Sequence, residues 1–368
     1  MSAREYPYAL AAVGPSPRVR GQSRVDQATL ARYIKEIGRG RNAAGDLSRE
    51  DAQALFSAML AGAVPELQLG AVLLALRVKG ESLEELAGFA AACEASYEHI
   101  AAVAPRVGDT APKSKHEPPI PVVIPSYNGA RQLPNLVPLL ALLLAREGVP
   151  VLVHGVTHDP GRVTTREVFE ALGLTPASSR EGAREQLAAH RLAFLPVDAL
   201  APAIGGLLAL RPRLGVRNSA HTLVKMLQPF ACPALRIVSV THPDYLVRMR
   251  EYFTRFDTAA LLLRGAEGEA VAHPRREPAL DWAYGGKVET WKADTLRAGH
   301  KPLVLRQAQD ERPESKHELP ELPEKDAKAT ARWIEAVLAG KQPVPAAIQH
   351  QLDCCKRAVR ELSLRGTT

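Results

Sequence analysis

The first part of the chain places apolar residues at the spacing of amphipathic helices. In the run LSREDAQALFSAMLAG, Leu55 and Met59 share one helix face with their apolar neighbours, while polar residues occupy the opposite face. Ser48 precedes Asp51 by three residues, an arrangement that resembles a helix-capping pair. The same spacing continues over 27–100, interrupted by glycines and a proline. This pattern predicts a compact all-helical unit of about four helices.

After a polar, proline-rich connection, the pattern changes to short continuous apolar runs separated by helical segments. The runs that predict buried strands are PVVIP, VPVLVHG, Leu192–Pro196, Leu235–Val240 and Ala259–Leu263. Leu136–Glu147 lies between the first two runs and has a helical pattern. Strand, helix and strand in that order predict a right-handed parallel crossover, with the loops at the carboxyl edge of one sheet. We therefore predict an α/β fold class for this part, with a mainly parallel central sheet.

These patterns divide the chain into segments of different character. The predicted segments are a flexible basic tail (1–24), an N-terminal helical domain (25–106), a linker (107–120) and an α/β domain (121–368) with a low-complexity insert near 307–327. With 368 residues, the chain is long enough for one large and one smaller domain, each with its own core.

Composition narrows the class of protein further. Apolar residues make up 46% of the chain and aromatic residues only 5%, which favours helices packed on a parallel sheet. No apolar run has the length of a membrane span, and the N-terminus lacks the pattern of a secretory signal. Four cysteines form no C-x-x-C pair. We expect a cytoplasmic protein with reduced thiols and no membrane partner.

Positive charge is concentrated in one segment. The formal net charge is +7, and residues 203–255 contain eight basic but only two acidic residues. Within this segment, cations alternate with neutral donors that suit phosphate oxygens. The residues that we predict to contact nucleic acid are Arg211, Arg213, Arg217, Asn218, His221, Lys225, Arg248 and Arg250. The alternative interpretation is a basic surface that only keeps the protein soluble, because net charge alone is a weak guide to partners.

Several motifs resemble the anthranilate phosphoribosyltransferase family. LSREDAQALFSAMLAG and the residues after it are similar to the family's N-terminal helical domain. VHG followed by REVFEALG is similar to its K-H-G-N loop and the next helix, and LRPRLGVRN to the segment that leads into R-T-I-F-N. The resemblance implies the family's two-domain fold and a homodimer joined through the helical domains.

The chain departs from this family where diphosphate and magnesium would bind. The glycine-rich G-T-G-G-D loop corresponds to Ser126, Tyr127, Asn128, Gly129 and Ala130. The lysine and asparagine of K-H-G-N become Val153 and Val156, and the expected Asp-Glu pair becomes Ala270 and Val271. Glu267 and Glu269 are offset from that pair, and we interpret them as part of a solvated turn. These losses predict an inactive site without catalytic residues, cofactor or metal ligands.

The predicted remnant of the substrate pocket is small. Its residues are Ser126, Asn128, Gly129, His154 and Gly155. His154 and His158 have the spacing H-x-x-x-H, but they lie in a loop after a strand, which disfavours a zinc site.

PSYNGARQLPNLVPLLALLLAREGVPVLVHG and RLGVRNSAHTLVKMLQP are similar to the YbiB-type branch of the family. This resemblance implies a homodimer that binds DNA or RNA without sequence preference. Two alternatives remain open. One is an active phosphoribosyltransferase that uses magnesium and phosphoribosyl diphosphate with an aromatic or amine substrate. The other is a dimer whose helical unit only docks partners.

Overall fold

The computed structural model describes residues 25–40, 43–104, 118–293 and 321–365, and these form two compact units. One unit contains the described residues up to Ser96 together with Leu210–Ser219, and the other contains Tyr97–Ala209 and the residues from Ala220 onward. The predicted tail and most of the predicted linker and insert lie outside the described residues. Among the described residues, no helix is long and apolar enough to span a membrane.

The first unit is a helical bundle, as the apolar spacing predicted. Its helices are α1 (Gln27–Ile37), α2 (Arg49–Leu60), α3 (Glu66–Lys79), α4 (Leu83–Glu94) and the short α10 (Arg211–Leu214). The Ser48 hydroxyl accepts a hydrogen bond from the Asp51 N–H at 3.1 Å, so the predicted cap is confirmed. Helices α2 and α4 pack together, with Phe56 and Phe89 stacked at 4.8 Å between ring centroids.

A distant segment joins this bundle through a buried carboxylate. The Ser219 hydroxyl donates to Glu81 Oε1 at 2.5 Å, and both side chains are buried. Arg213 on α10 forms an ion pair with Glu66 at the start of α3. The chain therefore returns to the helical bundle after about half of the α/β unit has been built. Local apolar spacing did not predict this return.

The second unit is built on a seven-stranded sheet with the strand order β3-β2-β1-β4-β5-β6-β7. The strands are β1 (Val122–Ser126), β2 (Val151–Gly155), β3 (Leu192–Pro196), β4 (Leu235–Val240), β5 (Ala260–Arg264), β6 (Ala279–Tyr284) and β7 (Lys287–Lys292). The first five strands pair in parallel, which confirms the predicted α/β class and its mainly parallel sheet. Strands β6 and β7 form an antiparallel hairpin at the edge, which the sequence pattern did not lead us to predict.

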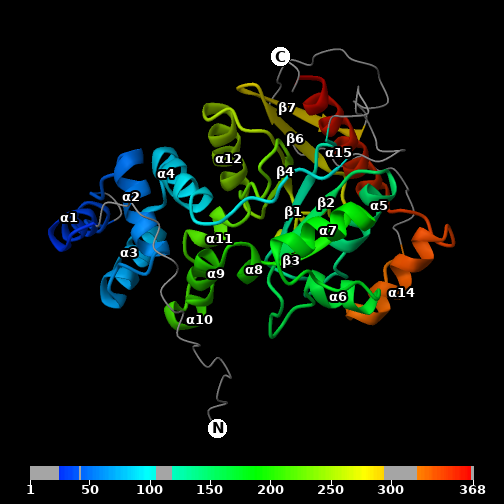
Figure 1. The fold of residues 1–368 in the computed structure, drawn as a ribbon, viewed down its shortest axis with the longest axis horizontal. Helices are drawn as coiled ribbons and strands as arrows, with labels where there is room; N and C mark the ends of the chain where they lie inside the picture. The colour runs from blue at the N-terminus through cyan, green and yellow to red at the C-terminus, as the bar shows by residue number, and fades with distance from the viewer. Residues whose placement is uncertain (1–24, 41–42, 105–117, 294–320, 366–368) are drawn as a thin grey trace, which may run out of the picture. The chain divides into compact units, whose positions relative to one another are not determined.

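Helices cover this sheet (Figure 1). The helices of the second unit are α5 (Val137–Arg146), α6 (Thr165–Ala171), α7 (Arg180–His190), α8 (Val197–Leu200), α9 (Pro202–Ala209), α11 (Ala220–Leu223), α12 (Pro243–Arg255), α14 (Ala327–Leu338) and α15 (Ala346–Arg365), with a 3₁₀ turn η1 (Ala266–Gly268). Of these, α5, α7, α8, α12 and α15 pack on the sheet. Alternate strand residues, such as Val122 and Ile124, share a core with α5 and α15. The buried residues of α12 lie outside that core, and α12 packs on β4 to β7. Both faces of the sheet are thereby buried, which explains the continuous apolar runs.

Candidate functional site

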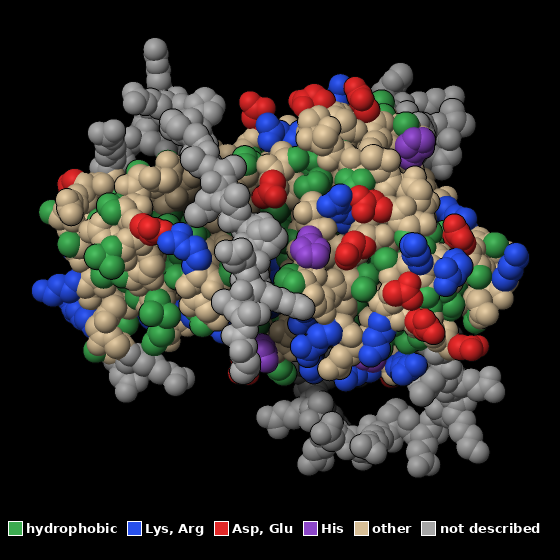
Figure 2. Space-filling model, turned by 90° about the horizontal axis from the view of Figure 1, so that it is seen from below, with side chains coloured by type: hydrophobic (Ala, Val, Ile, Leu, Met, Phe, Trp, Pro, Cys, Tyr) green, Lys and Arg blue, Asp and Glu red, His purple; other side chains and the backbone are tan. Residues whose placement is uncertain are grey.

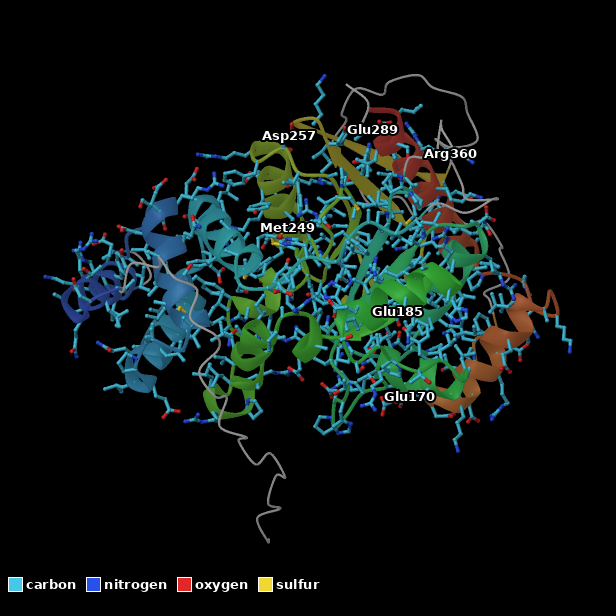
Figure 3. All side chains as sticks on the ribbon, viewed as in Figure 1. Glu170, Glu185, Met249, Asp257, Glu289 and Arg360 are labelled. Carbon is cyan, nitrogen blue, oxygen red and sulfur yellow. The ribbon has the colours of Figure 1, made fainter. Side chains whose placement is uncertain are left out.

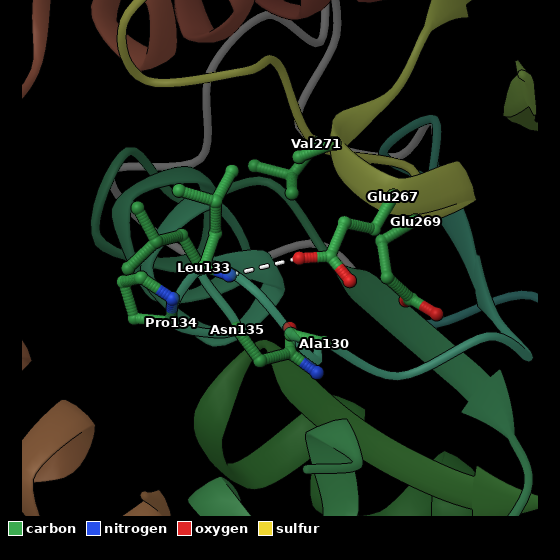
Figure 4. Close-up of a pocket in the computed structure, with 9 residues that line it drawn as sticks. Ala130, Leu133, Pro134, Asn135, Glu267, Glu269 and Val271 are labelled. Atoms are coloured by element: carbon green, nitrogen blue, oxygen red, sulfur yellow. Dashed lines mark hydrogen bonds between the residues drawn. The ribbon is translucent and has the colours of Figure 1, made fainter. Parts of the chain in front are cut away.

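The loop that follows β1 directs a series of backbone N–H groups at two carboxylates. Glu269 Oε1 accepts hydrogen bonds from the N–H groups of Asn128 and Gly129, both at 2.7 Å. Glu267 accepts three more, from Arg131 at 2.8 Å, Gln132 at 2.6 Å and Leu133 at 2.8 Å. Figure 4 shows the bond from Leu133 to Glu267. Gly129 adopts a φ of +65°, which favours glycine in this turn.

The prediction that Glu267 and Glu269 form a solvated turn is wrong. The Glu269 residue is only 2% exposed, and the Glu267 side chain is mostly buried. Buried carboxylates need donors, and the loop after β1 supplies them from about 140 positions earlier in the chain. A signal for these residues was present in the sequence, because both follow a predicted parallel strand, and such loops share one edge of the sheet. Carboxylates at that edge are therefore near the β1 loop.

The turn that carries these carboxylates is held in place by three side chains. Gly268 O accepts hydrogen bonds from Ser239 Oγ at 2.7 Å and from Lys225 Nζ at 3.0 Å. The amide of Asn128 donates to Glu267 O at 3.3 Å. Gly268 has a φ of +87°, and a Cβ atom there would lie 2.0 Å from Asn128 Nδ2. The close approach of the two loops therefore requires glycine at this position.

Further contacts attach the same turn to α15 and to the loop before α6. Gln351 on α15 donates to Ala270 O at 3.1 Å and accepts from the N–H of Ala272 at 2.6 Å. Arg162 donates to Gly129 O at 3.2 Å and lies 3.8 Å from a carboxylate oxygen of Glu267. The carboxylates are thus fixed from several elements of the second unit.

Little space remains beside the two carboxylates (Figure 4). A cavity of about 10 Å³ lies against them, roughly the space that one water molecule needs. The lining residues are Ala130, Leu133, Pro134, Asn135, Leu136, Ala266, Glu267, Glu269 and Val271. This cavity is far too small for a sugar diphosphate.

The predicted pocket residues come together at the carboxyl ends of β1 and β2. Ser126 pairs with Gly155 and Pro125 with His154 in the parallel register. The Ser126 hydroxyl donates to Thr165 Oγ1 at 2.8 Å, so it serves packing between β1 and α6. Asn128 and Gly129 bind Glu269, as described above. The five residues are neighbours, but their polar groups are largely engaged within the protein.

His154 is a buried neutral imidazole at the end of β2. Burial lowers its pKa to about 3, and burial also raises the pKa of Tyr127 well above its usual value. The Tyr127 hydroxyl lies 2.6 Å from His154 Nδ1, and the tautomer of the imidazole decides which of the two groups donates. The other ring nitrogen, Nε2, is buried and has no hydrogen-bond partner among the described residues.

The predicted nucleic-acid residues are divided between the two units. In the helical unit, Arg211 and Arg213 are exposed on α10, Arg217 is half-buried, and Asn218 is buried. Arg213 has an acidic partner in Glu66. Exposed guanidinium groups on α10 are accessible to a phosphate backbone.

In the α/β unit, the predicted cations have different surroundings. Lys225 donates to two backbone carbonyls, those of Gly268 and Ser239. Arg250 forms two hydrogen bonds with the buried carboxylate of Asp281, at 2.6 and 2.9 Å. Arg248 and His221 are half-buried, and Arg248 lies on α12. Lys225 and Arg250 thus have structural roles in this unit, whether or not nucleic acid binds.

Magnesium and phosphoribosyl diphosphate do not fit the residues present. A diphosphate needs the backbone N–H groups of the β1 loop, and those of Asn128, Gly129, Arg131, Gln132 and Leu133 bind carboxylates. Magnesium needs oxygen ligands in octahedral geometry, but three of the four oxygens of Glu267 and Glu269 are engaged by these N–H groups. Among the described residues, no cluster of three or more His, Cys, Asp or Glu side chains forms a metal site.

A helical bundle followed by an α/β unit on a mainly parallel sheet defines a phosphoribosyltransferase-type fold. The model of the glycosyl transferase family helical bundle domain matches residues 31–96. The chain is 44% identical over 333 residues to the uncharacterized protein YbiB of Escherichia coli K12, covering 90% of this chain and 94% of that protein. It is 28% identical to the anthranilate phosphoribosyltransferase of Pelotomaculum thermopropionicum, over 64% of this chain and 63% of that enzyme.

Solved structures agree with this fold. The anthranilate phosphoribosyltransferase of Thermus thermophilus superposes with a TM-score of 0.64 at 21% identity, over 92% of this chain and 89% of that chain. The Saccharomyces cerevisiae enzyme in complex with phosphoribosyl diphosphate and magnesium superposes with a TM-score of 0.67 at 15% identity, over 93% of each chain. The chain belongs to the anthranilate phosphoribosyltransferase-like family.

Proposed function

We propose that this protein binds nucleic acid without sequence preference, through the phosphate backbone, and does not transfer phosphoribosyl groups. The observation that carries the proposal is the internal use of the β1 loop, whose N–H groups already bind Glu267 and Glu269. A transferase of this family type would need those groups for the donor substrate. Cations of the 203–255 segment, by contrast, are partly exposed.

The exposed cations supply the chemistry that phosphate contacts require. Arg211 and Arg213 lie on the surface of the helical unit, and Arg248 is half-buried on α12. Figure 2 shows one face of the molecule, where several Lys and Arg side chains lie next to one another near the lower edge. Arginine contacts with phosphate fix a protein on nucleic acid without reading its sequence. DNA and RNA are both suitable partners under this proposal.

Fluorescence anisotropy of labelled single-stranded and double-stranded oligonucleotides tests the proposal. If six to ten cations contact phosphates, affinity falls roughly 10³- to 10⁵-fold between about 50 and 200 mM salt. The double variant Arg211→Ala with Arg217→Ala is expected to weaken binding to every sequence alike. Its matched control is Arg166→Ala with Arg360→Ala, which removes the same charge from α6 and α15. No binding at low salt, or equal losses in both double variants, contradicts the proposal.

Calorimetry separates this proposal from an active transferase. Phosphoribosyl diphosphate with magnesium is expected to give no heat of binding with the wild-type chain, because the loop donors are occupied. Saturable binding that depends on magnesium would favour the transferase instead. The S. cerevisiae enzyme provides a positive control, because its structure contains both ligands.

We further propose that the protein is a homodimer joined through its helical units. Three apolar side chains on α3 are exposed at one helical spacing: Leu67 at 87%, Leu74 at 51% and Val78 at 57%. Contiguous exposed apolar surface of this kind is typical of an interface, and a second copy of the same stripe matches its chemistry. A dimer would bury these three side chains.

Sedimentation velocity tests the dimer. The wild-type chain is expected to sediment as a dimer, and Leu74→Glu with Val78→Glu as a monomer, because two carboxylates would be buried without partners. Val247→Glu on α12, where the wild-type valine is also exposed, is the matched control and should leave the dimer intact. A monomeric wild-type chain would rule out this assembly.

A further inference from the structure

We propose that Glu267 and Glu269 act as resident anions that fill an anion-binding loop of this protein and keep diphosphate compounds out of it. The loop is the segment 126–133, and the two carboxylates are its internal ligands. This inference deepens the part of the proposed function that excludes phosphoribosyl transfer, and it does not depend on whether the protein binds nucleic acid.

The donor arrangement of the loop is that of an anion site. Five backbone N–H groups converge within six residues, from Asn128 to Leu133. Successive N–H groups in a turn form a concave site that binds phosphate or carboxylate groups. In this protein, the anions come from η1 and the residue after it, in the turn that follows β5. The five N–H donors therefore still converge as in an anion site, and two carboxylates of the same chain occupy them.

Two further observations distinguish this arrangement from an ordinary loop contact. The second carboxylate oxygen of Glu269, Oε2, is buried and has no hydrogen-bond partner among the described residues. Glu269 also lines the water-sized cavity described above. Glu267 also has a φ of +52°, a left-handed conformation that costs energy for a residue other than glycine. The turn thus adopts a strained backbone conformation that places both carboxylates at the loop.

The pairing of two carboxylates indicates which ligands they exclude. Glu269 takes the first two N–H groups and Glu267 takes the next three, so two anionic groups sit side by side along the loop. A diphosphate likewise presents two adjacent anionic groups with acceptor oxygens. Carboxylates in these positions would repel a diphosphate, and they already occupy the N–H donors that a diphosphate would need. Removing them should leave a site for a diphosphate.

Anion rescue of a variant tests this inference. In Glu267→Ala with Glu269→Ala, five N–H groups lose their acceptors, so the thermal unfolding midpoint is expected to fall. Inorganic pyrophosphate should raise that midpoint, because a ligand that binds only the native state stabilises it. The matched control is Glu185→Ala with Glu289→Ala, which removes two exposed carboxylates from α7 and β7 (Figure 3). In the control and the wild type, pyrophosphate should act only as sodium chloride of equal ionic strength does.

A second variant keeps the inference testable if the alanine pair does not fold. Glu269→Ala alone frees the N–H groups of Asn128 and Gly129 and leaves the three bonds of Glu267 in place. Calorimetry with pyrophosphate is expected to show affinity at least roughly tenfold higher for this variant than for the wild type. Circular dichroism establishes that the variant is folded. A folded variant that binds pyrophosphate no better than the wild type overturns the inference, as does tight binding by the wild type.

Discussion

Two regions of this protein suited to anions differ in how their charge is satisfied. In the β1 loop, backbone N–H donors are paired with the carboxylates of Glu267 and Glu269, and Glu269 is buried with its donors. In the basic segment, the donors are arginine and lysine side chains, and Arg211 remains exposed on α10. The loop is rigid and already occupied, whereas the segment presents cations to solvent.

The two regions suit different kinds of anion. A loop of backbone donors binds a compact anion by close approach, so it can be blocked by any internal anion of similar size. Long cationic side chains on a surface bind an extended polyanion, for which no close fit is needed. In this chain, an internally occupied donor loop and exposed cations therefore occur on one family fold.

The largest expected effect comes from two arginines on α12, of which Arg250 is paired with the buried Asp281 and Arg248 is half-buried. Arg250→Ala is expected to destabilise the protein by about 1.5–3 kcal/mol, because the buried Asp281 carboxylate loses a half-exposed cation but keeps its hydrogen bond from Thr290. Arg248→Ala, two residues earlier, should change stability by less than about 0.5 kcal/mol. Urea unfolding measures both. Similar stabilities for the two variants would show that the Asp281 pair does not hold α12 to the sheet.

The buried histidine beside the loop should make stability depend on pH. The pKa of His154 is about 3 in the folded protein, below its usual value, so the unfolded chain takes up the proton first as pH falls. Stability is thus complete above about pH 6.5, and about 2 kcal/mol is lost by pH 5. His154→Gln should remove this part of the pH dependence, measured by urea unfolding at several pH values.

The matched control for that measurement is the exposed His190→Gln on α7. Burial also lowers the pKa of His273 and His350, and both contribute equally to the wild type and to the variants. An unchanged pH profile in His154→Gln would mean that the pKa of this imidazole is nearly the same in the folded and the unfolded chain.

A single amide substitution at Glu267 measures how much its hydrogen bonds with the β1 loop contribute to stability. Glu267→Gln replaces one carboxylate oxygen with an NH₂ group. With the amide oxygen in the place of Oε1, the NH₂ group faces the N–H of Arg131, and that hydrogen bond is lost. We expect a loss of stability on the order of 1–2 kcal/mol by urea unfolding. Glu185→Gln on the exposed surface of α7 should have no measurable effect. Equal stability of the two variants would indicate that the Glu267 contacts contribute nothing.

The smallest expected effect concerns the exposed Arg211 and the salt dependence of oligonucleotide affinity. Arg211→Ala should reduce the slope of log affinity against log salt by about one for an oligonucleotide, because one phosphate contact is lost. Lys225→Met is a useful counterpart, since this amino group binds Gly268 O. If its role is structural, the variant loses stability but keeps the salt slope. A reversed outcome would assign the phosphate contact to Lys225.

Much of the fold follows from local patterns in the sequence. The five parallel strands were predicted within one or two residues, because each is a short apolar run between helical segments. The hairpin of β6 and β7 was missed, although Gly285 and Gly286 between them have positive φ angles and mark a tight two-residue turn. The Gly-Gly pair itself is the sequence signal for such a hairpin.

The sequence by itself determined most helices, the five parallel strands and the order of a helical part and an α/β part, because these depend on neighbours along the chain. Only the tertiary structure decided which groups bind the donors of the β1 loop. Glu269 meets the N–H of Gly129 across 140 residues, and Ser219 meets Glu81 across 138. Apolar periodicity carries no information about such pairs, because a polar side chain finds its partner through the folding of the whole sheet. Glu267 and Glu269 therefore resemble surface residues in the sequence and are buried ligands in the structure.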